Sequence, residues 1–304
     1  MASAREIRRR IKSVKNIAQV TRALQAVSAS KARRAQEAVI STRAYAQAAW
    51  KVLSDLSQQV GAPSELHPLF QQRPVKTLGL VLVSGDRGLC GAFNYNLVRA
   101  ALEFLKKQSA PVKAITVGKK GRELMWRRGF HIVGEYSGLP ATPSLANIRP
   151  IGRAVIDGYT SGEFDVVYLV YADFVNTLVQ RPAVKRLLPL KTTDVESQAM
   201  SEHAVVARTE RVTTDYIYEP SPRAILDVIV PRFTELQIYQ AVLESLASEH
   251  SARMVAMRNA TESAQDLVGS LTLRYNKARQ QGITSELLDI AGGAEALAQA
   301  MAAA

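Results

Sequence analysis

The sequence predicts an α/β protein: a long antiparallel coiled coil of the N- and C-terminal helices plus a central Rossmann-like α/β domain with a mostly parallel sheet. Three observations predict this fold. Apolar residues repeat at heptad spacing near both ends, all twelve prolines lie between Pro63 and Pro231, and strand-like and helix-like segments alternate between the two ends. The predicted domains are 1–62, 63–222 and 223–304.

The first domain is predicted to be one long helix. From Ile7 to Val60, positions at alternating steps of four and three define a seam in which twelve of sixteen residues are apolar. A heptad pattern sustained over so many turns is typical of a coiled coil. Residues 1–60 carry 12 basic and 3 acidic side chains in a chain of net charge +12, so the outer face of this helix attracts acidic partners.

The last domain has the same pattern. From Ile229 to Ala278 a second seam contains twelve apolar residues in fifteen positions, with His250 on the seam. One helix of this length cannot bury its apolar stripe alone. The two seams are most simply buried against each other in antiparallel orientation, with the proline-rich middle joining them at one end. Ordinary helices packed in a bundle are the alternative.

The middle of the chain is predicted to be an α/β domain. Apolar runs bounded by turn residues alternate with helix-like segments, which implies a mostly parallel sheet with right-handed crossovers. The polar segment 191–211 is predicted to be a long loop. The predicted strands lie at 75–84, 112–118, 130–136, 164–174 and 184–190, and the predicted helices at 94–108, 119–128 and 144–161.

The sequence SGDRGLCG (84–91) follows the first strand and precedes a helix, where doubly wound folds bind dinucleotides and phosphates. Its glycines match neither the G-x-G-x-x-G pattern nor the phosphate-loop pattern. A structural or protein-contact turn is therefore favoured over a nucleotide site. No histidine lies at a recognisable spacing from Cys90. Cys90 is therefore predicted to be a small buried residue rather than a nucleophile. No cofactor and no metal site are expected.

Two other functions remain open from the residues alone. The basic run RRRIKSVK (8–15) resembles a DNA-binding helix in composition, but the seam continues through it at Ile11 and Val14, whereas a forked basic region loses its seam where the charge begins. A steep salt dependence of DNA binding would favour nucleic-acid recognition. A nucleotide-dependent enzyme is the second alternative, and failure to bind ATP or NAD in calorimetry would exclude it. No apolar run is long enough to span a bilayer.

A resemblance to a known family favours a third function. In the following segments, and in their order, the chain resembles the gamma subunit of F-type ATP synthases: REIRRRIKSVKNIAQVTRALQAVSASKARR (5–34), SGDRGLCGAFN (84–94), NTLVQRPAVKRLLPL (176–190), YEP (218–220), ASEHSARMVAMRNAT (247–261) and LRYNKARQQGITSELLDIAGGAEAL (273–297).

The resemblance implies a mechanical role. The chain would be the non-catalytic central rotor shaft that couples proton or sodium ion flow to ATP synthesis or hydrolysis at the beta subunits. Its partners would be the alpha and beta subunits, the epsilon subunit and the c-ring, with one copy per complex and no nucleic acid. It would lie peripherally at the cytoplasmic side of a bacterial plasma membrane. The segment 191–211 has no cysteine pair, so the thiol switch of chloroplast members is not expected.

The family's contacts with the beta subunit map onto six residues of this chain: Leu24, Asp86, Arg87, Cys90, Arg279 and Gln280. The first occupies the place beside the acidic lever of beta, where many relatives have Met, a substitution that changes the volume little. The next three lie in the 84–91 motif, which faces beta in the family. The last two occupy the place where the upper shaft touches a loop of beta.

Overall fold

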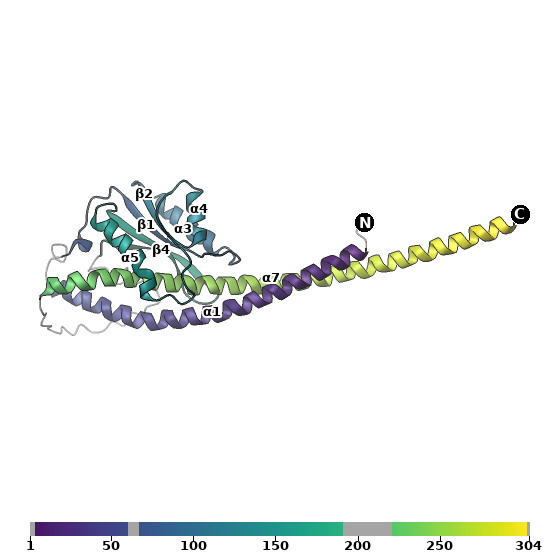
Figure 1. Ribbon diagram of the computed structural model, residues 1–304, viewed down its shortest axis with the longest axis horizontal. Helices are drawn as coiled ribbons and strands as arrows, with labels where there is room; N and C mark the ends of the chain where they lie inside the picture. The colour runs from purple at the N-terminus through teal and green to yellow at the C-terminus, as the bar shows by residue number, and fades with distance from the viewer. Residues whose placement is uncertain (1–3, 60–66, 191–220, 303–304) are drawn as a thin grey trace. The chain divides into compact units, whose positions relative to one another are not determined.

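Two long helices and a five-stranded sheet make up the fold in the computed structural model (Figure 1). The structure describes residues 4–59, 67–190 and 221–302. The predicted loop at 191–211, the seam position Val60 and the segment 218–220 lie outside the described residues. The division into domains 1–62, 63–222 and 223–304 stays a prediction.

Each predicted strand and helix is present, with ends that differ from the prediction by a few residues. The helices are α1 (Ala4–Gln59), η1 (Pro68–Phe70, a 3-10 helix), α3 (Phe93–Leu105), α4 (Lys119–Trp126), α5 (Leu145–Thr160) and α7 (Pro222–Ala302). The strands are β1 (Leu78–Val83), β2 (Val112–Val117), β3 (His131–Tyr136), β4 (Val166–Phe174) and β5 (Gln180–Leu188).

The sheet has the strand order β3-β2-β1-β4-β5. Strand β1 pairs in parallel with β2 and β4, β2 pairs in parallel with β3, and β5 pairs antiparallel with β4. The chain runs outward from β1 to β3 and then returns to the other side of β1 with β4. The strand order therefore reverses between β1 and β4, at the point where doubly wound folds bind their ligands.

Both faces of the sheet are covered at its centre, so the strands β1 and β4 are apolar on both sides. Alternate residues point to opposite faces. One face packs against α5 and α7, through residues such as Val81, Val83, Leu169, Tyr171, Ile151, Val155 and Val230. The other face packs against α3 and α4, through residues such as Leu80, Leu82, Val170, Leu97, Ala101 and Met125.

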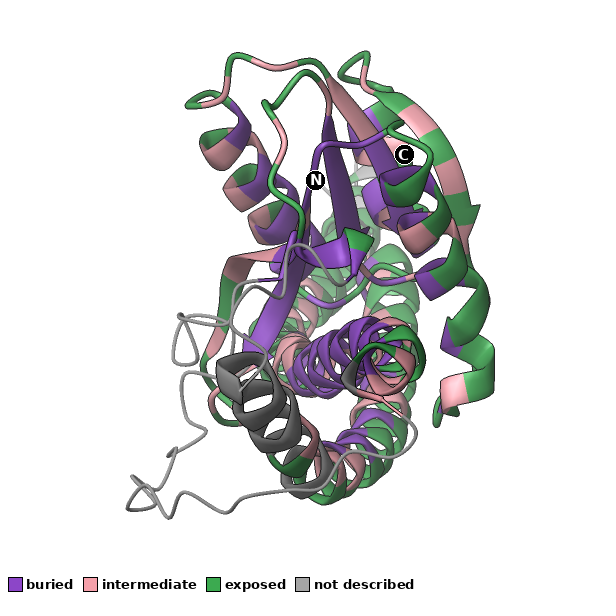
Figure 2. Ribbon diagram, turned by 90° about the vertical axis from the view of Figure 1, so that its left-hand side faces the viewer, coloured by how far each residue is buried: buried purple, intermediate pink, exposed green. Residues whose placement is uncertain are grey.

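The contacts divide the chain into two units, residues 27–255 and residues 1–26 with 256–304. In the first unit, Ala35 and Val39 of α1 pack against Leu243 and Ala247 of α7 on the predicted seams. Between residues 233 and 251, α7 is buried on nearly every side (Figure 2), because it packs against both the sheet domain and α1. A helix covered all round has no free polar face.

In the second unit, residues 4–26 and 256–278 also pair in antiparallel orientation along their seams. Thr21 Oγ1 and Thr261 Oγ1 lie 2.7 Å apart in a buried hydrogen bond. Ile7, Met257 and Ala264 are buried at other seam positions, while most of the residues off the seams are exposed. The heptad prediction is therefore confirmed at the seam positions whose side chains the structure describes. From residue 281 to residue 299 every side chain of α7 is exposed.

Helix α7 begins at one proline and contains another. Pro222 is the first helical residue, where a missing N–H removes no hydrogen bond. The helix then continues through Pro231, so the last proline of the chain lies within the helix.

Candidate functional site

The 84–91 turn joins β1 to α3 at the carboxyl edge of the sheet. The N–H of Gly85 donates to Oδ1 of Asn94 on α3 at 2.9 Å. A Cβ on Gly85 would lie 2.7 Å from Cδ of Glu249, so glycine is what lets the turn approach α7 so closely. Leu89 has a φ of 61°, uncommon for a residue with a Cβ, and is 68% exposed.

Asp86 joins this turn to two other backbone segments. Its carboxylate accepts the N–H of Lys119 at 3.0 Å and the N–H of Gly138 at 2.8 Å. Lys119 is the first residue of α4, where backbone N–H groups have no partner within the helix and a negative charge is stabilised by the helix dipole. Asp86 therefore holds the turn against the sheet domain.

The side chain of Cys90 is buried beneath the turn. Asn94 Nδ2 donates to Cys90 Sγ at 3.3 Å, and the thiol donates to the carbonyl of Arg87 at 3.8 Å. Burial raises the pKa of the Cys90 thiol, and this outweighs the lowering effect of the nearby Arg253. A thiol kept protonated is a weak nucleophile, so the geometry favours packing over covalent chemistry.

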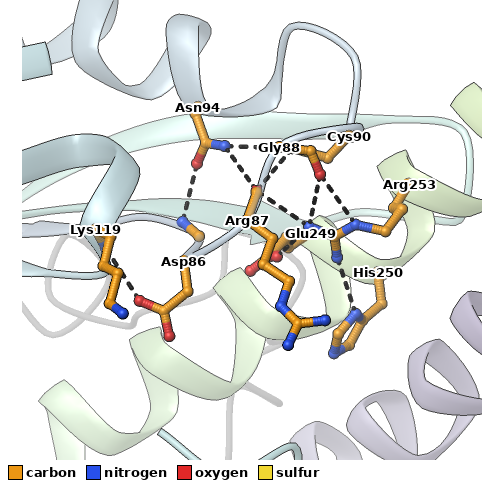
Figure 3. A network of polar contacts seen from close by, with 10 residues as sticks. Asp86, Arg87, Gly88, Cys90, Asn94, Lys119, Glu249, His250 and Arg253 are labelled. Atoms are coloured by element: carbon orange, nitrogen blue, oxygen red, sulfur yellow. Dashed lines mark hydrogen bonds and ion pairs between the residues drawn. The ribbon is translucent and has the colours of Figure 1, made fainter. Parts of the chain in front are cut away.

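Helix α7 holds the turn from the other side through one guanidinium group (Figure 3). Arg253 Nε donates to the carbonyl of Gly88 at 3.3 Å, and Nη2 donates to the carbonyls of Arg87 and Gly88 at 3.2 and 3.3 Å. The same Nη2 lies 2.5 Å from Glu249 Oε1, and the two side chains are only 12% and 9% exposed. We call Arg253, Glu249 and the two carbonyls the Arg253 clamp.

Burial dominates the electrostatics of the clamp. Desolvation raises the pKa of Glu249 even though the attraction of Arg253 opposes it. Next to the clamp, His250 Nδ1 lies 3.4 Å from Arg253 Nη1, and His250 Nε2 has no hydrogen-bond partner among the described residues. Burial, with smaller effects from the charges of Arg253 and of Lys31 on α1, lowers the pKa of His250 to about 4. The histidine is therefore neutral near pH 7.

Helix α7 also occupies the place where a nucleotide would bind in a doubly wound fold. Ser245 Oγ donates to the carbonyl of Val83 at the end of β1 at 3.4 Å and accepts the N–H of Ala172 on β4 at 3.1 Å. Ser248 Oγ donates to the carbonyl of Ala172 at 3.3 Å. The carboxyl ends of β1 and β4 are thus hydrogen-bonded to α7, which supports a contact turn rather than a nucleotide site at 84–91.

The remaining predicted contact residues lie in the unit formed by residues 1–26 and 256–304. Leu24 is half-buried on α1, one position from the seam residue Gln25. Arg279 and Gln280 are exposed on α7, and the guanidinium carbon of Arg279 lies 5.9 Å from the centroid of the Tyr275 ring. The structure brings Asp86, Arg87 and Cys90 together in one turn, as expected from their spacing.

Sequence reasoning missed the residues that hold the turn from α7 and α3: Glu249, Arg253 and Asn94. A signal for the first two was available, because an acidic and a basic residue four positions apart lie next to each other on a helix. Each directly precedes a predicted seam position, 250 and 254 respectively. Asn94 gave no such signal, since its partners come from the turn and are set by the fold of the domain.

Neither a metal site nor a membrane span is found in the described part of the chain. Among residues 4–59, 67–190 and 221–302, no three His, Cys, Asp or Glu side chains gather in a way that could hold a metal ion. No helix described there is both long enough and apolar enough to cross a membrane.

Comparison with known sequences gives matches along nearly the whole chain. The family model described as ATP synthase matches residues 3–297. The chain is 48% identical to the ATP synthase gamma chain of Herpetosiphon aurantiacus over 308 residues, which covers 98% of this chain and all of the relative. It is also 48% identical to the ATP synthase gamma chain of Chloroflexus aurantiacus, over 98% of this chain and 99% of the relative.

Comparison with solved structures shows that the fold is also shared with distant proteins. A chain of the Euglena gracilis mitochondrial ATP synthase matches with a TM-score of 0.63 and 21% identity, over 97% of this chain and 94% of that chain. A chain from the central stalk and c-ring structure of the Tetrahymena thermophila enzyme matches with a TM-score of 0.61 and 24% identity, over 79% and 99%.

Proposed function

Because this chain belongs to the ATP synthase gamma chain family, we propose that it is the central rotor shaft of an F-type ATP synthase. The observation that carries the proposal is 48% identity to a curated gamma chain, with 98% of this chain and all of that relative covered. The paired seams of α1 and α7 support it, since heptad seams sustained over many turns are typical of a coiled coil. The chain would couple proton or sodium ion flow to ATP synthesis or hydrolysis at the beta subunits.

The shaft would act without bond chemistry of its own. An asymmetric shaft favours a different conformation of each beta subunit that surrounds it, so its rotation shifts conformational populations in turn. The hydrogen bonds of α7 to the carboxyl ends of β1 and β4 support a non-catalytic role, because they use the edge at which α/β enzymes bind nucleotides.

The partners follow from the same proposal. The chain would bind the alpha and beta subunits as one copy per complex, together with the epsilon subunit and the c-ring. It would lie peripherally at the cytoplasmic side of a bacterial plasma membrane, since the two gamma chains at 48% identity come from the bacteria Herpetosiphon aurantiacus and Chloroflexus aurantiacus. The excess of basic residues in the first 60 positions supports attraction to acidic partner surfaces.

The contacts with beta are proposed residue by residue. The exposed side chains of Arg87, Arg279 and Gln280 would contact beta directly, and the half-buried Leu24 would contribute apolar surface. Asp86 and Cys90 would act through the turn, because the carboxylate of Asp86 already accepts two backbone N–H groups and Cys90 is buried.

Co-expression with the alpha and beta subunits of the same organism tests the proposal. We expect the chain to elute with them in a large complex on gel filtration, and ATPase activity to depend on its presence. Elution apart from alpha and beta with the fold intact would contradict the rotor function. DNA binding would then be measured against salt concentration as the next alternative.

A further inference from the structure

The 84–91 turn is held from two sides by different kinds of contact. Toward the sheet domain, Asp86 accepts two backbone N–H groups and Asn94 accepts the N–H of Gly85. Toward α7, the Arg253 clamp holds the carbonyls of Arg87 and Gly88. The turn is therefore a joint between the sheet domain and the helix.

The clamp uses properties that are specific to arginine. Its guanidinium bonds two consecutive carbonyls and a buried carboxylate at the same time, and its Nη1 faces His250. A planar group with five N–H donors can satisfy several acceptors in fixed directions, whereas the lysine ammonium is a compact charge on a flexible stem. Because Glu249 and Arg253 are nearly excluded from water, solvent screens their attraction little.

The residue just beyond the clamp supports a positioning role. Leu89 keeps a left-handed backbone conformation and an exposed apolar side chain. Such conformations persist where the surrounding contacts over-determine the backbone. The carbonyls bonded by Arg253 belong to the two residues immediately before Leu89, so the clamp fixes the backbone that presents Arg87 and Leu89 outward.

We propose that Arg253 is a positioning residue that makes the 84–91 turn and helix α7 move as one body, so that the turn stays fixed to the helix when load acts on the shaft. The effect of the clamp on the complex rests on the proposed rotor function, whereas the clamp itself is a property of the chain alone. Loss of the clamp would let the turn move relative to α7. In the complex, the residues that the turn presents outward, Arg87 and Leu89, would then no longer follow the helix rigidly as it rotates.

The test in the complex compares Arg253→Gln, Arg253→Lys and wild type in ATP synthase reconstituted into vesicles. Arg258→Gln is the matched control, because Arg258 forms an exposed pair with Glu262, also four residues apart, at 2.9 Å. We expect Arg253→Gln to lower the number of ions pumped per ATP hydrolysed several-fold, Arg253→Lys to lower it less, and Arg258→Gln to leave it unchanged. An unchanged ratio in Arg253→Gln would overturn the proposal.

A second test uses the full chain alone and does not depend on the complex. Spin labels at Leu89→Cys on the turn and Arg232→Cys on α7, in a Cys90→Ser background, report the distribution of distances between the turn and the helix. We expect this distribution to broaden in Arg253→Gln and to stay narrow in Arg258→Gln. A narrow distribution in Arg253→Gln would overturn the proposal even if stability had changed.

Two controls separate the possible causes of failure. If Arg253→Gln does not fold, the double variant Arg253→Gln with Glu249→Gln removes the buried carboxylate left without its partner, and it takes the place of the single variant in both tests. If the wild-type chain fails to assemble with alpha and beta, the rotor function is contradicted. The distance measurement on the isolated chain still tests whether Arg253 fixes the turn to α7.

Discussion

At the scale of single residues, the buried histidine beside the turn makes the stability of the fold depend on pH. His250 is enclosed by its own helix and by α1, with Arg253 and Lys31 as the charged groups that affect it. Its pKa falls from 6.5 to about 4 on folding, so the folded state binds fewer protons than the unfolded state between these values. The stability from neutral His250 is complete above pH 6.5 and is lost as the pH falls toward 4.

We therefore predict that His250→Gln makes the chain less sensitive to mild acid. Between about pH 7 and pH 4.5, this histidine should account for roughly 2 to 3 kcal/mol of the decrease in the free energy of unfolding of the wild type. Urea unfolding at the two pH values measures the decrease in each protein. The exposed His131, replaced by Gln, is the control. An equal decrease in wild type and His250→Gln would contradict the prediction.

A second prediction at this scale concerns Arg279, whose exposed side chain lies near the Tyr275 ring on the helix surface. Arg279→Ala should weaken association with the beta subunit by about 1 kcal/mol or more, in the range typical of an arginine that matters at an interface. The isolated chain should keep its unfolding midpoint. Assembly and ATPase activity of the reconstituted complex are the measurements, and unchanged values for both would show that Arg279 is not a contact.

At the scale of elements, periodicity was enough to predict the long helices and their seams. It could not predict that α7 is buried all round between residues 233 and 251, because that burial depends on the sheet domain packing onto the helix. Buried polar residues there, such as Ser245 and Ser248, bond the strand ends rather than water. The sequence also did not predict the direction of the fifth strand. In the structure β5 pairs antiparallel with β4.

The Thr21–Thr261 hydrogen bond gives a prediction for the paired helices. Each hydroxyl also lies within hydrogen-bond distance of a carbonyl of its own helix, Thr21 with Ala18 at 3.1 Å and Thr261 with Met257 at 2.8 Å. Replacing one threonine by valine leaves the other buried hydroxyl with fewer partners and should cost about 1 kcal/mol. Replacing both gives two apolar groups of the same shape in contact, which should be nearly neutral.

A double-mutant cycle over wild type, Thr21→Val, Thr261→Val and the double variant measures this coupling by urea unfolding. The double variant should be more stable than the sum of the two single changes predicts. Strict additivity of the two changes would show that the two hydroxyls contribute independently.

At the scale of the whole molecule, the site was only partly predictable from the sequence. The order of strand, turn and helix was enough to locate Asp86, Arg87 and Cys90 together. The clamp could not be predicted, because Arg253 lies more than 160 residues from the turn in sequence and such a contact is set by tertiary packing. The backbone partners of Asp86 at Lys119 and Gly138 were hidden for the same reason.

The end of α7 gives a prediction for the chain with and without partners. From residue 281 to residue 299 all side chains are exposed, among them Ile283, Leu287, Ile290 and Leu297. A helix without tertiary contacts is only marginally stable in water. Amide hydrogen exchange in this segment should therefore be fast in the isolated chain and slow by orders of magnitude in the complex, whereas residues 233–251 should be protected in both. Equal protection of 281–299 in the two states would contradict the prediction.

The same exposed segment has a consequence for the life of the chain inside a cell. A helix that opens readily and carries leucine and isoleucine on its surface is an early target for proteases and chaperones. A copy that has found no partners would be degraded faster than one whose end is enclosed by them. The abundance of the chain would then follow the supply of its partners without any sensor, because the surface that assembly covers is also the surface that marks the unassembled copy for removal.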